Sequence, residues 1–123
     1  MAKVLIIDDD GDLRESVSDW LSGEHEVCQA ASVPEAVALL AELCPDVVVC
    51  DFDLPPHRGD DFLAMVAEQH PHVGRFMLTG TPGRALGVAY AICHRVFRKG
   101  CDLMDLTRAI RDFLASREPK HAR

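Results

Sequence analysis

Five short apolar runs alternate with amphipathic stretches along the chain, and this alternation predicts the fold. The runs are Val4–Ile7, Glu26–Ala31, Val47–Cys50, Arg75–Gly80 and Val96–Phe97. Between these runs and after the last one, apolar residues recur every three or four positions, as they do on the buried face of a helix. We therefore expect five strands and five helices in alternation, with short connections and no internal repeat.

Most amphipathic stretches carry a signal for a helix start. Asp12 with Glu15, Ser32 with Glu35, and Asp102 are the expected N-terminal capping residues. The fourth helix is expected from Thr81 to about Cys93, weakened by two glycines. The apolar stripes expected to face the core in the other four helices are Leu13, Val17, Trp20, Leu21; Val37, Leu40, Leu43; Phe62, Leu63, Val66; and Leu103, Leu106, Ile110, Phe113.

The connectivity predicts a flavodoxin-like, doubly wound α/β fold. Right-handed crossovers between successive strands give a parallel sheet with helices on both faces. Five strands suit the order 2-1-3-4-5, in which the ligand crevice lies between the first and third strands. The third run, Val47–Cys50, has no polar alternation, which is typical of a central strand buried on both sides.

Composition narrows the class of protein. The chain has 123 residues, enough for one domain, with 13 Lys and Arg against 20 Asp and Glu and a net charge of −7. This balance argues against binding to nucleic acid or to an anionic membrane. No apolar run approaches the ~20 residues of a membrane span, and no signal peptide opens the sequence. The five cysteines form no C-x-x-C pair, so we expect neither zinc nor a disulfide framework, and we expect a reducing cytoplasm.

Carboxylates follow two neighbouring strands of the predicted sheet. Asp8 and Asp9 end the first strand and Asp51 ends the third, so all three should meet in one crevice. Such a cluster calls for a counter-charge, and Mg²⁺ prefers oxygen ligands of this kind. Thr79 and Lys99 end the fourth and fifth strands and add a hydroxyl and an ammonium group. This set suits phosphoryl transfer, with Asp51 as the nucleophile that becomes an aspartyl phosphate.

Each of these residues also has a simpler interpretation when it is taken alone. Asp51 could merely start a turn, Thr79 could be an ordinary strand residue, and Lys99 could be a solvated lysine at a strand end. Asp10 and Asp12 suit the start of a helix better than a ligand role. The coincidence of acids, hydroxyl and ammonium at the carboxyl ends of strands is what favours a site.

Four segments resemble the receiver domains of bacterial two-component response regulators, and the resemblance covers nearly the whole chain. They are Val4–Asp10, Asp46–Pro55 with Gly59 beyond it, Phe76–Gly80 and Val96–Lys99. The resemblance implies that Asp51 accepts a phosphoryl group from a phosphohistidine on a sensor histidine kinase or a histidine phosphotransfer protein.

The resemblance also implies the role of each site residue. Asp9 and Asp51 would bind Mg²⁺ directly, together with the main-chain carbonyl of Asp53, while Asp8 would act largely through water. Thr79 would swing toward the phosphoryl oxygens. Lys99 would neutralise one of those oxygens.

Three features depart from the family pattern. Gly100 follows Lys99 where the family has proline after a cis peptide bond, and Val96 stands where the family has its switch aromatic. Phe97, the next residue, should point to the other face of the strand. The stretch from Thr79 to Lys99 is short and glycine-containing, so we expect a loosely held fourth helix.

We expect a receiver over residues 1–116 with a polar tail over 117–123. It would not be an enzyme, and it would signal to an unidentified downstream protein through the face formed by the fourth helix, fifth strand and fifth helix. No output domain follows Phe113, so output would come from a partner unless the chain is a fragment. Two alternatives stay open: a haloacid-dehalogenase-type phosphatase using Asp51 and Asp53, and a receiver-like binding module that works without phosphate.

Overall fold

The structure, a computed structural model, describes residues 2–81, 83, 87 and 91–117. Its elements alternate as the apolar pattern predicts, with an additional two-stranded hairpin after the third strand. In chain order they are β1 (Lys3–Ile7), α1 (Gly11–Leu21), β2 (Glu26–Ala30), α2 (Val33–Leu43), β3 (Val47–Cys50), β4 (Asp53–Leu54), β5 (His57–Arg58), α3 (Gly59–Gln69), β6 (Gly74–Thr79), β7 (Arg95–Arg98) and α5 (Leu103–Ser116).

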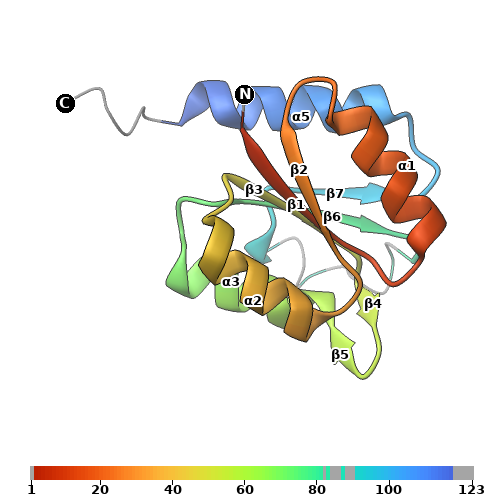
Figure 1. The fold of residues 1–123 in the computed structure, drawn as a ribbon, viewed down its shortest axis with the longest axis vertical. Helices are drawn as coiled ribbons and strands as arrows, with labels where there is room; N and C mark the ends of the chain where they lie inside the picture. The colour runs from red at the N-terminus through yellow and green to blue at the C-terminus, as the bar shows by residue number, and fades with distance from the viewer. Residues whose placement is uncertain (1, 82, 84–86, 88–90, 118–123) are drawn as a thin grey trace.

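The main sheet has five parallel strands in the order β2-β1-β3-β6-β7, which confirms the predicted 2-1-3-4-5 order. Helices α1 and α5 cover one face of this sheet, and α2 and α3 cover the other (Figure 1). The chain therefore adopts the expected doubly wound α/β arrangement, with the strand order reversing between β1 and β3.

Strand β3 lies at the centre of the core, and this position explains why all its residues are apolar. Val47 and Val49 pack into the cluster under α1 and α5, whereas Val48 and Cys50 pack into the cluster under α2 and α3. All four residues are at most 1 % exposed. Because both faces of the strand are covered, no position along it can carry a polar side chain, and the run is continuously apolar.

The helix starts are mostly those predicted, with one correction. Ser32 and Asp102 cap α2 and α5 by accepting hydrogen bonds from main-chain N–H groups of the first turn. Asp12, however, is not the N-cap of α1: Asp10 is, and its side chain accepts from the N–H groups of Asp12 and Leu13. Either aspartate has the right chemistry, and the length of the β1–α1 turn decides between them.

Two residues of the predicted apolar stripes lie on the surface instead of in the core. Trp20 is 49 % exposed and Val37 is 44 % exposed. Val17 and Leu21, four residues apart, mark the buried centre of α1, and Trp20 falls at the edge of that face, toward α5. There its Nε1–H donates a hydrogen bond of 2.8 Å to Thr107 Oγ1.

A small antiparallel hairpin follows β3 and was not predicted. Asp53 pairs with Arg58 and Leu54 pairs with His57, around Pro55 and Pro56. The hairpin projects from the end of the sheet where the carboxyl ends of the strands lie (Figure 1). It carries Asp53 away from β3 before the chain enters α3.

The predicted fourth helix and the predicted polar tail fall largely outside the described residues, so both stay predictions. At the end of the former, the Ala91 N–H donates to the Gly87 carbonyl oxygen at 3.1 Å. At the start of the latter, the Arg117 guanidinium lies 3.0 Å from an Asp46 carboxylate oxygen. Among the helices that the structure describes, none combines the length and apolar character needed to cross a membrane.

Candidate functional site

The ends of four parallel strands place the predicted site residues at one edge of the sheet. The main-chain N–H of Asp51 donates to the Ile7 carbonyl oxygen at 2.9 Å, which fixes the end of β3 beside the end of β1. The N–H of Lys99 donates in the same way to the Thr79 carbonyl oxygen at 2.8 Å, which fixes β7 beside β6. The main-chain hydrogen bonds of the sheet therefore fix the positions of Asp51 and Lys99 independently of any contact between their side chains.

Three carboxylates converge at this edge. Asp8, Asp9 and Asp51 each offer an oxygen, and these oxygens all lie within 4.8 Å of one another. Asp8 and Asp51 are 3 % and 4 % exposed, whereas Asp9 is exposed. The cluster thus has two acids in the floor and one at the mouth, open to solvent and to a reactant.

The Lys99 side chain crosses from β7 into this cluster. Its Nζ lies 3.0 Å from Asp51 Oδ2 and 3.1 Å from Asp8 Oδ2, so it bridges the two buried acids. Gly100, which follows it, has a positive φ of 88°, a conformation that glycine adopts without strain. The only cis peptide bond in the described backbone joins Pro55 and Pro56. The peptide bond between Lys99 and Gly100 is therefore trans, and the Lys99 side chain still contacts Asp51.

Burial and crowding shift the titration of all three bridged groups. Burial raises the pKa of Asp51, and the Asp8 charge raises it further, while the Lys99 ammonium partly opposes both. Burial also raises the pKa of Asp8, against the hydrogen bond from the Asp10 N–H and the contact with Lys99. Burial alone would lower the pKa of Lys99, but its contacts with Asp51 and Asp8 raise it overall.

This charge distribution fits a hard divalent cation. Three carboxylates carry three negative charges, and the Lys99 ammonium compensates one of them. The donors available are carboxylate oxygens, which Mg²⁺ favours over nitrogen or sulfur. The residues present therefore fit the Mg²⁺ that the sequence predicts.

Thr79 and Asp53 lie beside the acid cluster and are linked through Thr81. The Thr79 side chain is fully buried, and its Oγ1 accepts from the Thr81 N–H at 3.1 Å. Thr81 Oγ1 in turn lies 3.5 Å from Asp53 Oδ2, a long hydrogen bond. The structure therefore brings Asp51 and Lys99 into direct contact, and it holds the Thr79 hydroxyl, at the end of β6, against Thr81 in the turn that follows.

Two residues that shape the site were not predicted to do so. Arg14 Nη1 donates to the Asp8 carbonyl oxygen at 2.7 Å, and its Nε donates to Gln29 Oε1 at 3.0 Å. Gly59 packs so close to β3 that a Cβ there would lie 1.7 Å from the Asp51 carbonyl oxygen. A positive side chain near the start of a helix is unfavourable because of the helix dipole. The position of Arg14 was therefore a weak indication that it binds a nearby acceptor.

Val96 and Phe97 occupy opposite faces of β7, as predicted. Val96 packs against the cluster under α2 and α3, and Phe97 is buried in the cluster under α1 and α5. Phe97 also lies under the Arg95 guanidinium, 4.8 Å from its ring centroid. The position where the family resemblance implies an aromatic switch therefore holds a partly buried aliphatic side chain.

Comparisons with known proteins agree on the family. A sequence model described as the response regulator receiver domain matches residues 4–111. The response regulator protein FleR of Pseudomonas aeruginosa is 34% identical over 79 residues, which cover 63% of this chain and 17% of FleR. The sensor histidine kinase TmoS of Ectopseudomonas mendocina is 30% identical over 88 residues, covering 70% of this chain and 9% of TmoS. The chain thus spans less than a fifth of either relative.

A solved structure shares the fold over almost the whole chain. The response regulator receiver domain protein from Clostridium thermocellum superposes with a TM-score of 0.85 at 28% sequence identity. The match covers 94% of this chain and 95% of that one.

Proposed function

The chain belongs to the response regulator receiver domain family, and on that premise we propose that Asp51 is its phosphoacceptor. The donor would be a phosphohistidine on a sensor histidine kinase or a histidine phosphotransfer protein. The observation that carries this proposal is the Asp51 carboxylate at the open edge of the sheet, 3.0 Å from Lys99 Nζ and within the carboxylate cluster.

In the proposed reaction, an Asp51 carboxylate oxygen attacks the phosphorus of the phosphohistidine. The new O–P bond forms as the N–P bond breaks, and the imidazole leaves with the electron pair of that bond. Lys99 is already placed beside Asp51, so its ammonium can pair with an oxygen of the arriving phosphoryl group without a large movement. Thr79 would donate its hydroxyl to a second oxygen after giving up its contact with Thr81.

Asp9 and Asp51 would hold Mg²⁺ with the main-chain carbonyl of Asp53, and Asp8 would contribute through water. When bound, the cation supplies positive charge that offsets the carboxylates and the phosphoryl oxygens. Asp8 keeps its own role in this arrangement, because it fixes the Asp10 N–H at 2.9 Å and shares Lys99 with Asp51.

Signalling would follow from the new charge at Asp51. The turn after β6 holds the Thr79 hydroxyl against Thr81, and a phosphoryl group would offer that hydroxyl a stronger, charged acceptor. Movement of this turn would alter the face formed by the fourth helix, β7 and α5, which a downstream protein would read. We place this receiver function in residues 1–116, with 117–123 as a tail, and in the cytoplasm.

The test is Mg²⁺-dependent labelling at Asp51. Purified protein incubated with acetyl phosphate or a phosphorylated kinase should take up at most one phosphoryl group per chain, and EDTA should prevent it. Asp51→Asn should abolish labelling. Asp12→Asn, an exposed acid in the first turn of α1, should leave it intact.

Two outcomes would contradict the proposal. Sustained hydrolysis of p-nitrophenyl phosphate that depends on Asp51 and Asp53 would indicate a phosphatase. Absence of any label from acetyl phosphate and from the kinases of the same organism would indicate a binding module that works without phosphate.

A further inference from the structure

Arg14 lies in the first turn of α1 and reaches the sheet beside the acid cluster. Its Nη1–H donates to the main-chain carbonyl oxygen of Asp8 at 2.7 Å, just after β1, and its Nε–H donates to Gln29 Oε1 at 3.0 Å, on β2. Both acceptors are uncharged oxygen atoms. The two hydrogen bonds therefore hold the Arg14 side chain in place without neutralising its charge.

The shape of the guanidinium group makes this pair of contacts specific. Its N–H donors lie in one plane at fixed angles, so a hydrogen bond at Nε determines where Nη1 can point. Gln29 thus orients Arg14 toward the Asp8 carbonyl oxygen. A lysine side chain carries its donors on one rotating ammonium group and does not reproduce this geometry.

The Asp8 carbonyl belongs to the peptide unit that joins Asp8 to Asp9. The atoms of such a unit, from one Cα to the next, lie in one plane. A hydrogen bond to its oxygen therefore also helps to fix the Cα of Asp9, from which the exposed carboxylate of the cluster projects. Asp9 makes no main-chain hydrogen bond of its own within the described part of the chain, so its position depends on its neighbours.

Other contacts fix the chain on either side of Asp9. The Asp8 N–H donates to the Ala30 carbonyl oxygen at 3.1 Å, and the Asp10 N–H donates to Asp8 Oδ1 at 2.9 Å. The Asp10 carbonyl oxygen accepts from the Arg14 N–H at 2.9 Å. The peptide unit between Asp8 and Asp9 is held by the Arg14 side chain, so we expect this unit to rotate first if that side chain is lost.

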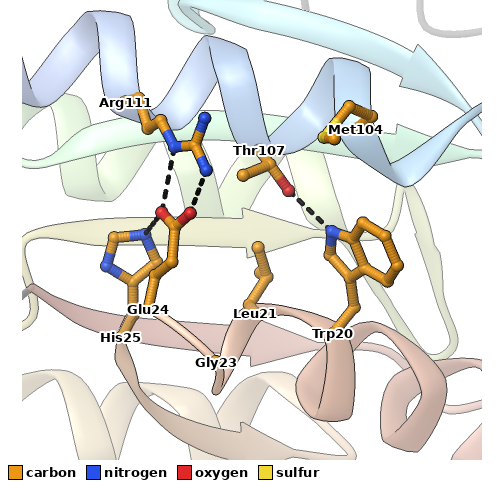
Figure 2. A pocket seen from close by; sticks show the side chains of 8 residues that line it. All are labelled: Trp20, Leu21, Gly23, Glu24, His25, Met104, Thr107 and Arg111. Atoms are coloured by element: carbon orange, nitrogen blue, oxygen red, sulfur yellow. Dashed lines mark hydrogen bonds and ion pairs between the residues drawn. The ribbon is translucent and has the colours of Figure 1, made fainter.

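The far end of α1 is held by a separate set of contacts. A groove of about 260 Å³ separates this end from α5, and side chains join the two helices across it (Figure 2). Trp20 Nε1–H donates to Thr107 Oγ1 at 2.8 Å, and the Arg111 guanidinium donates two hydrogen bonds to Glu24 in the turn after α1. Loss of Arg14 should therefore free the turn before α1 while the helix stays packed.

We propose that Arg14, oriented by Gln29, is a positioning residue for Mg²⁺, because it fixes the peptide unit that presents Asp9 to the cation. This inference rests on the proposed Mg²⁺ site of Asp9 and Asp51. Groups beyond the direct ligands tune metal affinity by orienting those ligands. The charge of Arg14 by itself would repel a cation. Removal of Arg14 thus weakens Mg²⁺ binding if its positioning role dominates and strengthens it if its charge dominates.

The opposite signs give a direct test. Titration of metal-free, ¹⁵N-labelled protein with MgCl₂, followed by the NMR signals of the amides around Asp9 and Asp51, measures the Mg²⁺ dissociation constant of the folded chain. Arg14→Met should raise this constant by about 10-fold or more. Arg14→Lys keeps the charge but not the planar group, and should also raise it. Gln29→Leu should raise it by a smaller factor, and should add nothing to Arg14→Met, because Gln29 acts through Arg14.

A matched control and a second measurement complete the experiment. Arg108→Met, at an exposed arginine on α5, should bind Mg²⁺ as the wild-type chain does. Labelling of Asp51 by acetyl phosphate should need more Mg²⁺ in Arg14→Met, yet reach the wild-type rate once Mg²⁺ saturates. Mg²⁺ binding by Arg14→Met that is as tight as in the wild type, or tighter, would overturn the inference, as would an effect of Gln29→Leu that persists without Arg14. A wild-type chain that binds no Mg²⁺ would refute the proposed site and this inference together.

Discussion

The acid cluster and the α1–α5 groove use charged residues in opposite ways. In the cluster, Lys99 Nζ lies 3.1 Å from Asp8 and 3.0 Å from Asp51, and the two acids are buried. Beside the groove between α1 and α5, the acids of α1 (Asp12, Glu15 and Asp19) and Arg108 of α5 are exposed on separate helices, and Arg111 of α5 pairs with Glu24 at the surface. Buried carboxylates that lie close together lower the stability of the fold, and a bound cation can restore it. This arrangement suits a site that binds a cation and carries out a reaction. Separated, exposed charges cost little and can select a partner.

Removing the amine from the acid cluster should have the largest effect on stability. Lys99→Met keeps the length of the side chain but leaves two buried carboxylates without their shared cation. We expect the free energy of unfolding at pH 7, without divalent cations, to fall by about 3 kcal/mol. Urea titration measures this change. Lys3→Met, at an exposed lysine on β1, should change it by less than about 0.5 kcal/mol, and equal losses in the two variants would contradict the prediction.

Removing the central acid should act in the opposite direction. Burial and the neighbouring Asp8 charge raise the pKa of Asp51, so its ionised form is disfavoured in the folded protein. Asp51→Asn should therefore raise the free energy of unfolding at pH 7 by about 1 kcal/mol in metal-free buffer. Asp19→Asn, on the exposed side of α1, should have almost no effect. A destabilised Asp51→Asn protein would show that the cluster is not strained.

Asp53 offers a kinetic test at the rim of the cluster. Its carboxylate adds negative charge near the position of an incoming phosphoryl group, which should repel an anionic donor and an attacking hydroxide. Asp53→Asn should accelerate both phosphorylation by acetyl phosphate and loss of the label severalfold. Asp61→Asn, at an exposed acid in the first turn of α3, should change neither rate. Unchanged rates in the Asp53 variant would refute this role.

The smallest expected effect concerns His25, below the groove. Burial lowers the pKa of His25 from its ordinary value of 6.5, although the Glu24 charge partly opposes this. The unfolded chain therefore takes up this proton at higher pH than the folded protein does. The stability that His25 contributes is complete above pH 6.5 and is lost as the pH falls through the folded pKa.

His25→Gln should accordingly make the free energy of unfolding less sensitive to pH between 7 and 5. The difference from the wild-type chain should stay below about 1 kcal/mol. Urea titrations at several pH values would measure it, with His72→Gln as the control at an exposed histidine. A steeper pH dependence in the His25 variant would show that the sign is wrong.

Much of this architecture could be predicted from the sequence because it follows from strand periodicity. The uninterrupted run Val47–Cys50 identified the central strand, and parallel connectivity then brought Asp8, Asp9, Asp51 and Lys99 to one edge. These inferences needed only the number of strands and the positions of their ends.

What was missed depends on local turn geometry or on contacts between distant segments. Asp10 and Asp12 are chemically equal candidates for the N-cap of α1. The length of the turn after β1 places Asp10, and not Asp12, at the N-cap position. Arg14 binds a main-chain carbonyl, and its place near the start of α1 gave only a weak signal of that partner. Trp20 fits the helical stripe by spacing, but its position is set by Thr107, 87 residues away along the chain.

The tight packing of Gly59 has a mechanical consequence. Its N–H donates to the Phe52 carbonyl oxygen at 2.7 Å, and its Cα lies against the Asp51 carbonyl, so the end of β3 and the first turn of α3 form one rigid joint. Any displacement that starts at Asp51 should therefore leave this joint still and be absorbed across the crevice, where the Thr79 hydroxyl contacts the N–H of Thr81 at 3.1 Å and its hydroxyl at 3.4 Å. The packing of the backbone at Gly59 thus sets the direction in which this edge of the domain can move.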